Sequence, residues 1–347
     1  MRQPLRILVT ALTLAMVVVS CDRSGEPPTL RLIAHDSFKE GVTDDTFAAF
    51  TEATGIGVEV IAAGDAGVMV NQSILSKDNP LADVLFGIDD TFLSRAIDAG
   101  IFLPHEAAPI GSIDPGLLRA DNLVTPIDIG DVCINYDKAW FDEAGMTVPD
   151  SLDELRDPEI ASLLVVEHPA TSSPGLAFLL ATIDRYGEDG WAGFWADLRS
   201  GGVEVSSSWN AAYYGSFTRY EGERPLVVSY ASSPPAEVMF ADPPTAIAPT
   251  GVITDGCYRQ VEYAGVLAGT DHPEAAGELI DYMLSVEFQQ QVPESWFVFP
   301  VNQEAELPPV FATHAVLPPE PTRFDPDHIA TNRDRWIDEW IEVMEQP

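Results

Sequence analysis

The sequence predicts an α/β fold built as two lobes that are joined by two long strands. Its first third alternates strand-like runs with amphipathic helices, the pattern typical of a sheet with parallel strands. Two long strand-like stretches, 128–138 and 257–267, bracket a middle block with the same alternation. The chain has 347 residues, and beyond about 250–300 residues one hydrophobic core usually gives way to two. A chain that leaves one lobe, builds a second and returns has two hinge strands and a cleft between the lobes.

The first block contains apolar runs whose lengths and flanking residues distinguish strands from helices. Residues 43–55 begin with Thr and Asp, which suit a helix start, and end on Gly, which suits a helix stop. The run 82–88 is apolar throughout, as a buried strand requires. The expected strands are 29–38, 58–64 and 82–88, and the expected helices are 43–55, 68–76 and 92–100.

The middle block and the tail repeat this alternation. Residues 174–187 carry a Pro in the first turn of an apolar helix. In the tail, 333–344, Trp336 and Trp340 recur at helical spacing, which favours packing over binding. The expected strands are 128–141, 163–169, 203–209, 224–234 and 257–269, and the expected helices are 174–187, 272–292 and 333–344.

The N-terminus reads as an export signal. Arg2 and Arg6 precede the apolar run 7–20, which as a helix would span about 21 Å, too short for a bilayer core of roughly 30 Å. The run ends in V-V-S-C, which resembles a bacterial lipobox with Cys21 as the lipidated residue; an ordinary signal with a chance Cys is the alternative. We expect a lipid anchor on the outer face of the cell membrane, or a periplasmic location. The expected segments are signal peptide 1–20, tether 21–28, first lobe 29–130 and 263–347, and second lobe 131–262.

The charge balance is strongly acidic. The chain has 55 Asp and Glu against 18 Lys and Arg, a formal net charge of −37. Without a basic face to neutralise phosphates, nucleic-acid binding is excluded. The field of so many acids favours cationic solutes. Adaptation to salt or a need for solubility explains the acidity equally well, because the acids are spread along the whole chain.

Cys133 and Cys257 remain once Cys21 is set aside, and each lies on one of the two long strands. In an exported protein, a pair of cysteines is a disulfide candidate. A metal site is a poor alternative, because no His or Cys stands at ligand spacing near either residue. We therefore hypothesise a disulfide that staples the two crossover strands, and we expect no metal site.

Enzyme motifs are absent from the sequence. It contains no G-x-S-x-G, no H-E-x-x-H, no Walker A and no Rossmann glycine fingerprint. Paired carboxylates are abundant, but in so acidic a chain their presence does not discriminate. We expect a protein that is not an enzyme and needs no cofactor.

Ser- and Thr-rich turns recur where predicted strands end, at 171–175, 206–210 and 230–234. In α/β folds, ligands bind beyond the carboxyl ends of the strands. Trp209 and Tyr230 lie beside two of these turns and offer faces for a flat or cationic ligand. Each turn taken alone could be an ordinary cap, which uses the same residues, but their number and placement favour a binding site.

Nine strings occur in an order that resembles the periplasmic thiamine-binding proteins of bacterial ABC importers. They run from about residue 30 to about residue 340: HDSF, GDAG, ADVLFGIDDTFL, VTPIDIGDVCINYDK, TSSPGLAFLL, SSWNAAY, LVVSYASSP, YRQVEYAGVLAGT and SWFVFPVN. The resemblance implies a two-lobed type II periplasmic-binding-protein fold that holds thiamine, often its phosphates, in the cleft. It also implies delivery to a membrane permease driven by an ATPase. We expect a monomer.

The resemblance also implies which residues contact the ligand. Aromatic rings could stack on the pyrimidine and thiazolium rings, the Asp of the turn after the second strand could accept from the aminopyrimidine, and serines could hold the hydroxyethyl or phosphate end. The implied residues are Asp65, Ala66, Ser172, Ser173, Trp209, Tyr230, Ala231, Ser232, Ser233, Pro234 and Trp296, together with His35 and Asp36.

Two positions depart from the family pattern. His35 stands where a Tyr is common, and Pro235-Ala236-Glu237 stands where a second Tyr is expected. His35 could stack weakly, meet a phosphate if protonated, or only support its neighbours. With these changes, the ligand could be free thiamine or its mono- or diphosphate. The negative net charge of the chain favours the free cation.

Three rival functions remain at this point. One is a binder of another cation such as a polyamine. A second is a ferric-iron binder: Tyr213 and Tyr214 are adjacent, but no His or acid stands beside them in the sequence, which argues against iron. The third is a secreted hydrolase of phosphorylated vitamins.

Overall fold

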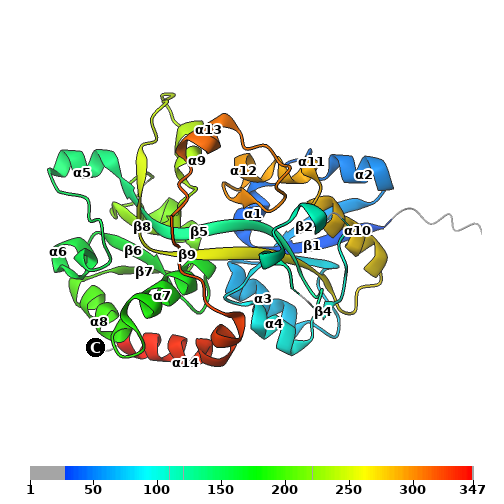
Figure 1. The fold of residues 1–347 in the computed structure, drawn as a ribbon, viewed down its shortest axis with the longest axis horizontal. Helices are drawn as coiled ribbons and strands as arrows, with labels where there is room; N and C mark the ends of the chain where they lie inside the picture. The colour runs from blue at the N-terminus through cyan, green and yellow to red at the C-terminus, as the bar shows by residue number, and fades with distance from the viewer. Residues whose placement is uncertain (1–27, 109, 120, 221, 346–347) are drawn as a thin grey trace, which may run out of the picture.

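Two long antiparallel strands run through the middle of the protein and join its two halves (Figure 1). They are β5 (Thr125–Asp137) and β9 (Thr250–Leu267), paired from Thr125 opposite Ala264 to Asp137 opposite Thr250. The structure is a computed structural model, and it describes residues 28–108, 110–119, 121–220 and 222–345. Within these residues the strands form one mixed sheet in the order β2-β1-β3-β9-β5-β8-β6-β7, with β4 on β9 and β10 on β5.

Each half of the sheet adds parallel strands to one side of the central pair. In the first half, β2, β1 and β3 are parallel to one another, and β3 pairs antiparallel to β9. In the second half, β7, β6 and β8 are parallel, and β8 pairs antiparallel to β5. The strands are β1 (Thr29–Ala34), β2 (Gly57–Ala62), β3 (Val84–Asp89), β4 (Phe102–Leu103), β6 (Leu164–Glu167), β7 (Glu204–Ser206), β8 (Leu226–Tyr230) and β10 (Phe299–Pro300).

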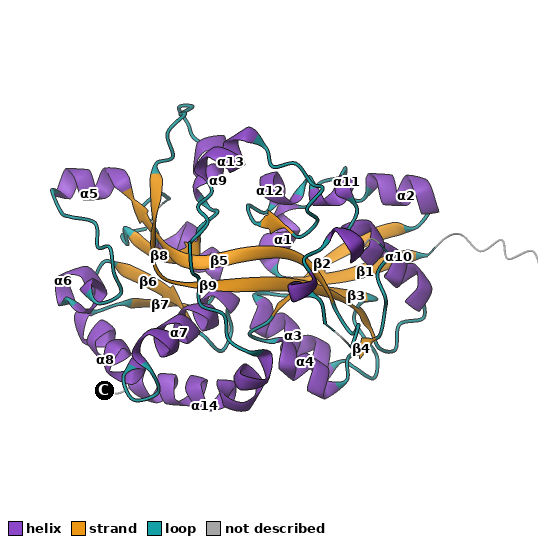
Figure 2. Ribbon diagram, viewed as in Figure 1, coloured by secondary structure: helices purple, strands orange, loops and turns teal. Residues whose placement is uncertain are grey.

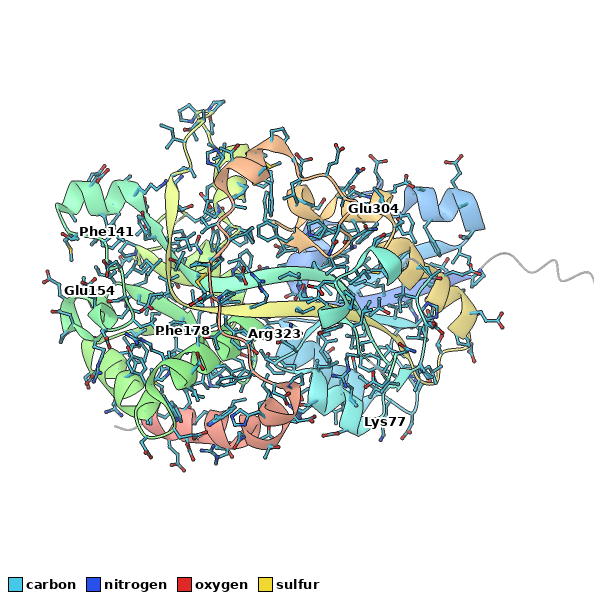
Figure 3. All side chains as sticks on the ribbon, viewed as in Figure 1. Lys77, Phe141, Glu154, Phe178, Glu304 and Arg323 are labelled. Atoms are coloured by element: carbon cyan, nitrogen blue, oxygen red, sulfur yellow. A yellow bond between two sulfur atoms is a disulfide. The ribbon has the colours of Figure 1, made fainter. Side chains whose placement is uncertain are left out.

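Helices cover both faces of the sheet (Figure 2). One of them, α7 (Ser173–Tyr186), is buried at every residue from Ser173 to Ile183, including Phe178. Phe178 and Phe141 lie in one half, Lys77 and Glu304 in the other, and Arg323 beside the strands that join them (Figure 3). The other helices are α1 (Asp36–Gly41), α2 (Ala48–Thr54), α3 (Ala66–Leu75), α4 (Leu93–Ala99), α5 (Lys138–Ala144), α6 (Pro158–Ala161), α8 (Trp191–Gly201), α9 (Pro234–Met239), α10 (Pro273–Met283), α11 (Val286–Gln289), α12 (Val292–Ser295), α13 (Pro309–His314) and α14 (Pro326–Met344). Short turns η1 (Ile110–Ser112), η2 (Pro115–Leu117), η3 (Glu154–Arg156) and η4 (Ala211–Ser216) complete the set.

The predicted α/β fold with two crossover strands is confirmed, while several element boundaries differ. The expected strand 128–141 ends at Asp137, because the Asp137 carboxylate accepts the Ala139 N–H and so begins helix α5. The expected helix 272–292 is broken after Met283, where Ser285 caps a new short helix. Helix α8 was not predicted.

The C-terminal helix α14 lies along the outside of the second half, and its N-terminal end is directed toward the first half (Figure 1). It packs on α8 of the second half and on α4 of the first. Trp340 meets Trp195 of α8 with ring centroids 5.4 Å apart, and Arg199 donates to the Val343 carbonyl at 2.6 Å. Trp336 and Trp340 are both buried, as packing residues should be. Helix α14 therefore contacts helices of both halves.

A disulfide joins the two crossover strands. The sulfurs of Cys133 and Cys257 are bonded at 1.98 Å, and the bond closes 124 residues of sequence. Both residues are buried beside Ala231, at the end of β8. The disulfide therefore holds β5 and β9 together next to the Ser-rich turn 230–234.

The expected signal peptide and most of the tether, with Cys21, lie outside the described residues. Among the helices that are described, none combines the length and the apolar character needed to cross a membrane.

Candidate ligand-binding cleft

A cavity opens between the two halves of the sheet. It encloses about 720 Å³, including the part that is open to solvent. Strands β5 and β9 cross its floor, and both halves contribute to its walls. The lining residues are His35, Ser37, Phe38, Phe86, Asp128, Trp209, Tyr213, Tyr214, Tyr220, Tyr230, Ser233, Ala236, Phe240, Glu262, Trp296, Phe297 and Val298.

The second half supplies an aromatic wall centred on Trp209. Its indole N–H donates to Ser229 Oγ at 3.0 Å, which fixes the ring at the end of β8. Tyr213 stacks on the indole at 4.9 Å, and Tyr214 meets its edge at 5.5 Å. Both tyrosines belong to η4, a π-helical turn, and such turns often occur at functional sites. The wall is therefore rigid where it can meet a flat ligand.

A carboxylate lies behind this aromatic wall. Glu237 accepts hydrogen bonds from Tyr213 at 2.9 Å and Tyr220 at 3.2 Å, and it pairs with Arg219 at 3.3 Å. No His or acid stands beside Tyr213 and Tyr214 in the sequence, but helix α9 brings Glu237 to Tyr213 in the fold. These hydroxyls are engaged as donors, and no group of three or more His, Cys, Asp and Glu in the described part of the chain could hold a metal ion.

The first half supplies His35, Phe38 and Trp296. His35 caps helix α1: its Nδ1 accepts the Phe38 N–H at 3.1 Å, so the ring hydrogen belongs on Nε2. Gly87 has φ +89° and makes room for the ring, because a Cβ there would lie 2.3 Å from His35 Cδ2. Trp296 stacks on Phe38 at 4.6 Å and donates to its carbonyl at 2.9 Å.

The floor carries two facing carboxyl groups. Asp128 and Glu262 are paired across β5 and β9 and are 3% and 8% exposed. Burial raises the pKa of Asp128 well above its usual value, and the neighbouring Glu262 raises it further by its charge and by hydrogen bonding. Glu262 lies 3.4 Å from His35 Nε2. Burial lowers the pKa of His35, but Glu262 and nearby aspartates together outweigh burial, so the pKa is raised.

A smaller pocket adjoins the cavity and shares three of its lining residues. Its lining residues are His35, Asp36, Ser37, Gly64, Asp65, Ser208, Trp209 and Asn210. Neither list of lining residues contains a Lys or an Arg. The combined site thus offers aromatic faces and acids, a combination that suits a flat cation.

Three hydrogen bonds hold the two halves together across this smaller pocket. Asp65, which caps α3 in the first half, accepts the Trp209 N–H at 3.0 Å. The Gly67 N–H donates to the Thr171 carbonyl at 3.0 Å. A side chain at Gly67 would obstruct this approach, since a Cβ would lie 2.8 Å from that oxygen. Asn210 donates to Glu40 at 2.8 Å.

The residues implied by the resemblance fall into two groups. Those that line the cavity or the smaller pocket are His35, Asp36, Asp65, Trp209, Tyr230, Ser233 and Trp296. Those that are buried and line neither are Ala66, Ser172, Ser173, Ala231, Ser232 and Pro234. Asp36 has a structural role as well, because it accepts the Gly64 N–H at 2.8 Å. Ala236 lines the cavity where the family pattern has a second Tyr. Phe240 and Tyr220 supply aromatic rings to the same cavity.

Sequence reasoning missed several lining residues. Tyr213 follows Trp209 by four residues, and that spacing could have indicated a shared helix face. Phe297 could not have been found this way: it has φ +56°, which is uncommon for a non-glycine residue. Asp128 and Glu262 are brought together only by the register of β5 and β9.

A two-halved sheet, two crossover strands and a cleft walled by both halves define the class of proteins that bind small solutes outside the cell and hand them on. The family model described as bacterial extracellular solute-binding protein matches residues 79–320. The chain belongs to this family.

Individual proteins that resemble this chain belong to the same class. The thiamine-binding periplasmic protein of Escherichia coli K12 is 30% identical over 315 residues, which cover 90% of this chain and 92% of that protein. The protein of the same name from Brucella suis biovar 1 is 30% identical and covers 90% and 91%. A solved structure of a periplasmic thiamin binding protein has a TM-score of 0.81 and 28% identity, and covers 92% and 97%.

Proposed function

We propose that this solute-binding protein captures thiamine in the cleft and delivers it to the permease of an ABC importer. The observation that carries the proposal is the composition of the site: aromatic faces above a pair of carboxyl groups, with no Lys or Arg among the lining residues. Thiamine is a small molecule with two flat rings, one of them permanently cationic, so it matches both features. Relatives named as thiamine-binding proteins support the choice.

Each part of the ligand has a partner of suitable chemistry. Trp209 and Tyr230 offer ring faces to the thiazolium or pyrimidine, and cation–π contact with such rings contributes about 0.5–2 kcal/mol. Ser233 and Ser37 supply hydroxyls for the hydroxyethyl end. The Asp65 carboxylate already accepts two backbone N–H groups, from Ala66 and Trp209, so its main role is to close the cleft rather than to bind the ring.

Closure couples binding to delivery. The hydrogen bonds Asp65–Trp209, Gly67–Thr171 and Asn210–Glu40 connect the halves without any ligand atom. A ligand sandwiched between Trp209 and the first half adds to these contacts only when the cleft is shut, so it shifts the population toward the closed form. A permease that recognises the closed form would then receive loaded protein.

The remaining expectations form part of the same proposal. The protein is exported and held to the outer face of the cell membrane through lipidated Cys21, it acts as a monomer, and it catalyses no reaction. The supporting observations are the V-V-S-C string at residues 18–21 and the match of the chain to a family of extracellular solute-binding proteins.

Isothermal titration calorimetry on the purified protein tests the proposal directly. We expect saturable one-to-one binding of thiamine, and weaker heats with spermidine or ferric citrate as rival ligands. Native mass spectrometry of protein purified without added ligand should show thiamine carried along. No binding of thiamine or its phosphates would refute the proposal.

A further inference from the structure

The pair Asp128 and Glu262 is placed in the cleft at a cost in stability. Two carboxyl groups from adjacent strands face each other at the cavity floor, almost fully buried. No described residue gives a hydrogen bond to Asp128 Oδ1. Burial of a carboxyl oxygen without a hydrogen-bond partner destabilises a protein, so Asp128 calls for a role in binding.

The side chains around Asp128 and Glu262 indicate what kind of ligand the pair could bind. Four groups face it: His35 from the N-terminus of α1, Asp89 from β3, Tyr230 from β8 and Gln260 from β9. Asp89 is already satisfied by Thr91 and by the Phe92 N–H, and it does not line the cavity. Gln260 donates to Glu262 at 3.3 Å, and Tyr230 donates to Gln260 at 3.4 Å. His35 is the single cationic candidate, and its Nδ1 is occupied as the acceptor of the Phe38 N–H.

We propose that Asp128 and Glu262 form a cation subsite, which selects ligands that carry a permanent positive charge on an aromatic ring. This inference rests on the proposed function, and it identifies the side chains that interact with the positive charge of the thiazolium. Trp209 and Tyr230 supply the faces that such a ring needs beside the acids. Glu262 lies near His35 Nε2 and accepts from Gln260, but neither carboxyl group has a Lys or Arg partner among the lining residues, so the ligand brings the permanent positive charge that the pair lacks.

Binding should then release a proton. In the ligand-free protein Asp128 holds a proton, because burial and the adjacent carboxyl group of Glu262 raise its pKa. A cation next to them favours the doubly ionised form. One carboxyl O–H bond breaks, the proton passes to the buffer, and the site gains one negative charge against the positive charge of the ring.

The first test uses the wild-type protein alone. Thiamine binding is measured by calorimetry near pH 7 in phosphate and in Tris, whose ionisation enthalpies differ, and we expect release of about one proton per ligand. His35→Asn keeps a good helix cap but removes the imidazole. Proton release should persist in this variant. No release in the wild type between pH 5 and pH 8, or loss of release in His35→Asn, overturns the inference.

The second test compares thiamine with its neutral isostere, in which a thiophene ring replaces the thiazolium. We expect the wild type to prefer thiamine, and the double variant Asp128→Asn/Glu262→Gln to lose roughly tenfold or more of that preference while its affinity for the isostere is kept. The control Glu52→Gln/Glu59→Gln removes two exposed acids and should keep the preference.

The outcomes separate the inference from the proposed function. If the wild type binds neither compound, both fall. If the wild type binds thiamine but the preference is unchanged in Asp128→Asn/Glu262→Gln, only the cation subsite is overturned. The wild-type proton count needs no substitution, so it decides the matter even where the double variant does not fold.

Discussion

Two layers of buried polar groups lie at this end of the sheet, and only one of them reaches the cavity. Asp128 and Glu262 form the floor. Away from both pockets, Glu167 is fully buried at the end of β6, and no described residue bonds either of its carboxyl oxygens or the Ser172 hydroxyl. Burial raises the pKa of Glu167 and of Asp128 alike. Burial and a raised pKa therefore do not mark a binding residue; access to the cavity does.

The largest effect on binding should come from the aromatic wall. Trp209→Ala removes the ring face and should weaken thiamine binding by about 1–3 kcal/mol, the range found for a base stacked on an aromatic side chain. Calorimetry measures the change. Trp140→Ala, which removes a half-buried Trp of α5 that lines neither pocket, is the matched control and should leave the affinity unchanged. Equal losses in the two variants would show a general effect on folding instead of stacking.

The next effect tests closure. Asp65→Ala removes a charged hydrogen bond between the halves and leaves the Trp209 N–H without its acceptor, so binding should weaken by about 1–2 kcal/mol. Small-angle scattering should also show less compaction on adding thiamine. Asp36→Ala removes a comparable bond to the Gly64 N–H within one half, and should change compaction little. The same scattering change in both variants would argue against a latch at Asp65.

The comparison of layers also explains what the sequence could reveal. The crossover strands were predictable because 128–138 and 257–267 are long strand-like stretches that bracket a second block of alternating strands and helices. Trp209 and Tyr230 were predictable as strand-end aromatics. Asp128 and Glu262 are far apart in the sequence, and only the register of β5 on β9 makes them neighbours. The positions of Ser172 and Ser232 near strand ends suggested ligand contacts, but both side chains are buried away from the cavity. Whether a strand-end residue reaches the cavity depends on tertiary packing, which the motif does not encode.

Glu167 gives a test of the rear layer through the pH dependence of stability. Its raised pKa means that the native state holds a proton which the unfolded state loses above about pH 4.3. The free energy of unfolding should therefore fall as pH rises from there to the folded pKa, by up to about 1.4 kcal/mol per pH unit for this proton. Glu167→Gln cannot titrate, so its urea-unfolding curve should be flatter with pH.

Binding of thiamine by Glu167→Gln should be unchanged, since this side chain lines neither pocket. Asp128→Asn is the counterpart from the front layer: it should flatten the pH dependence of stability as well, but it should also alter binding. A loss of affinity in Glu167→Gln would remove the distinction between the two layers.

The smallest effect comes from two adjacent serines, of which only Ser233 lines the cavity. Ser233 lines the cavity and its hydroxyl lies 3.1 Å from Ser229 Oγ, which anchors Trp209. Ser233→Ala should weaken binding by about 0.5–1 kcal/mol, the net value of one neutral hydrogen bond. Ser232 is fully buried, and no described residue bonds its hydroxyl, so Ser232→Ala should change affinity by less than about 0.5 kcal/mol. Calorimetry with thiamine on both variants ranks them. A larger loss of affinity for Ser232→Ala would mean that the buried serine becomes accessible to the ligand when the cleft closes, and that the residues around it move on closure.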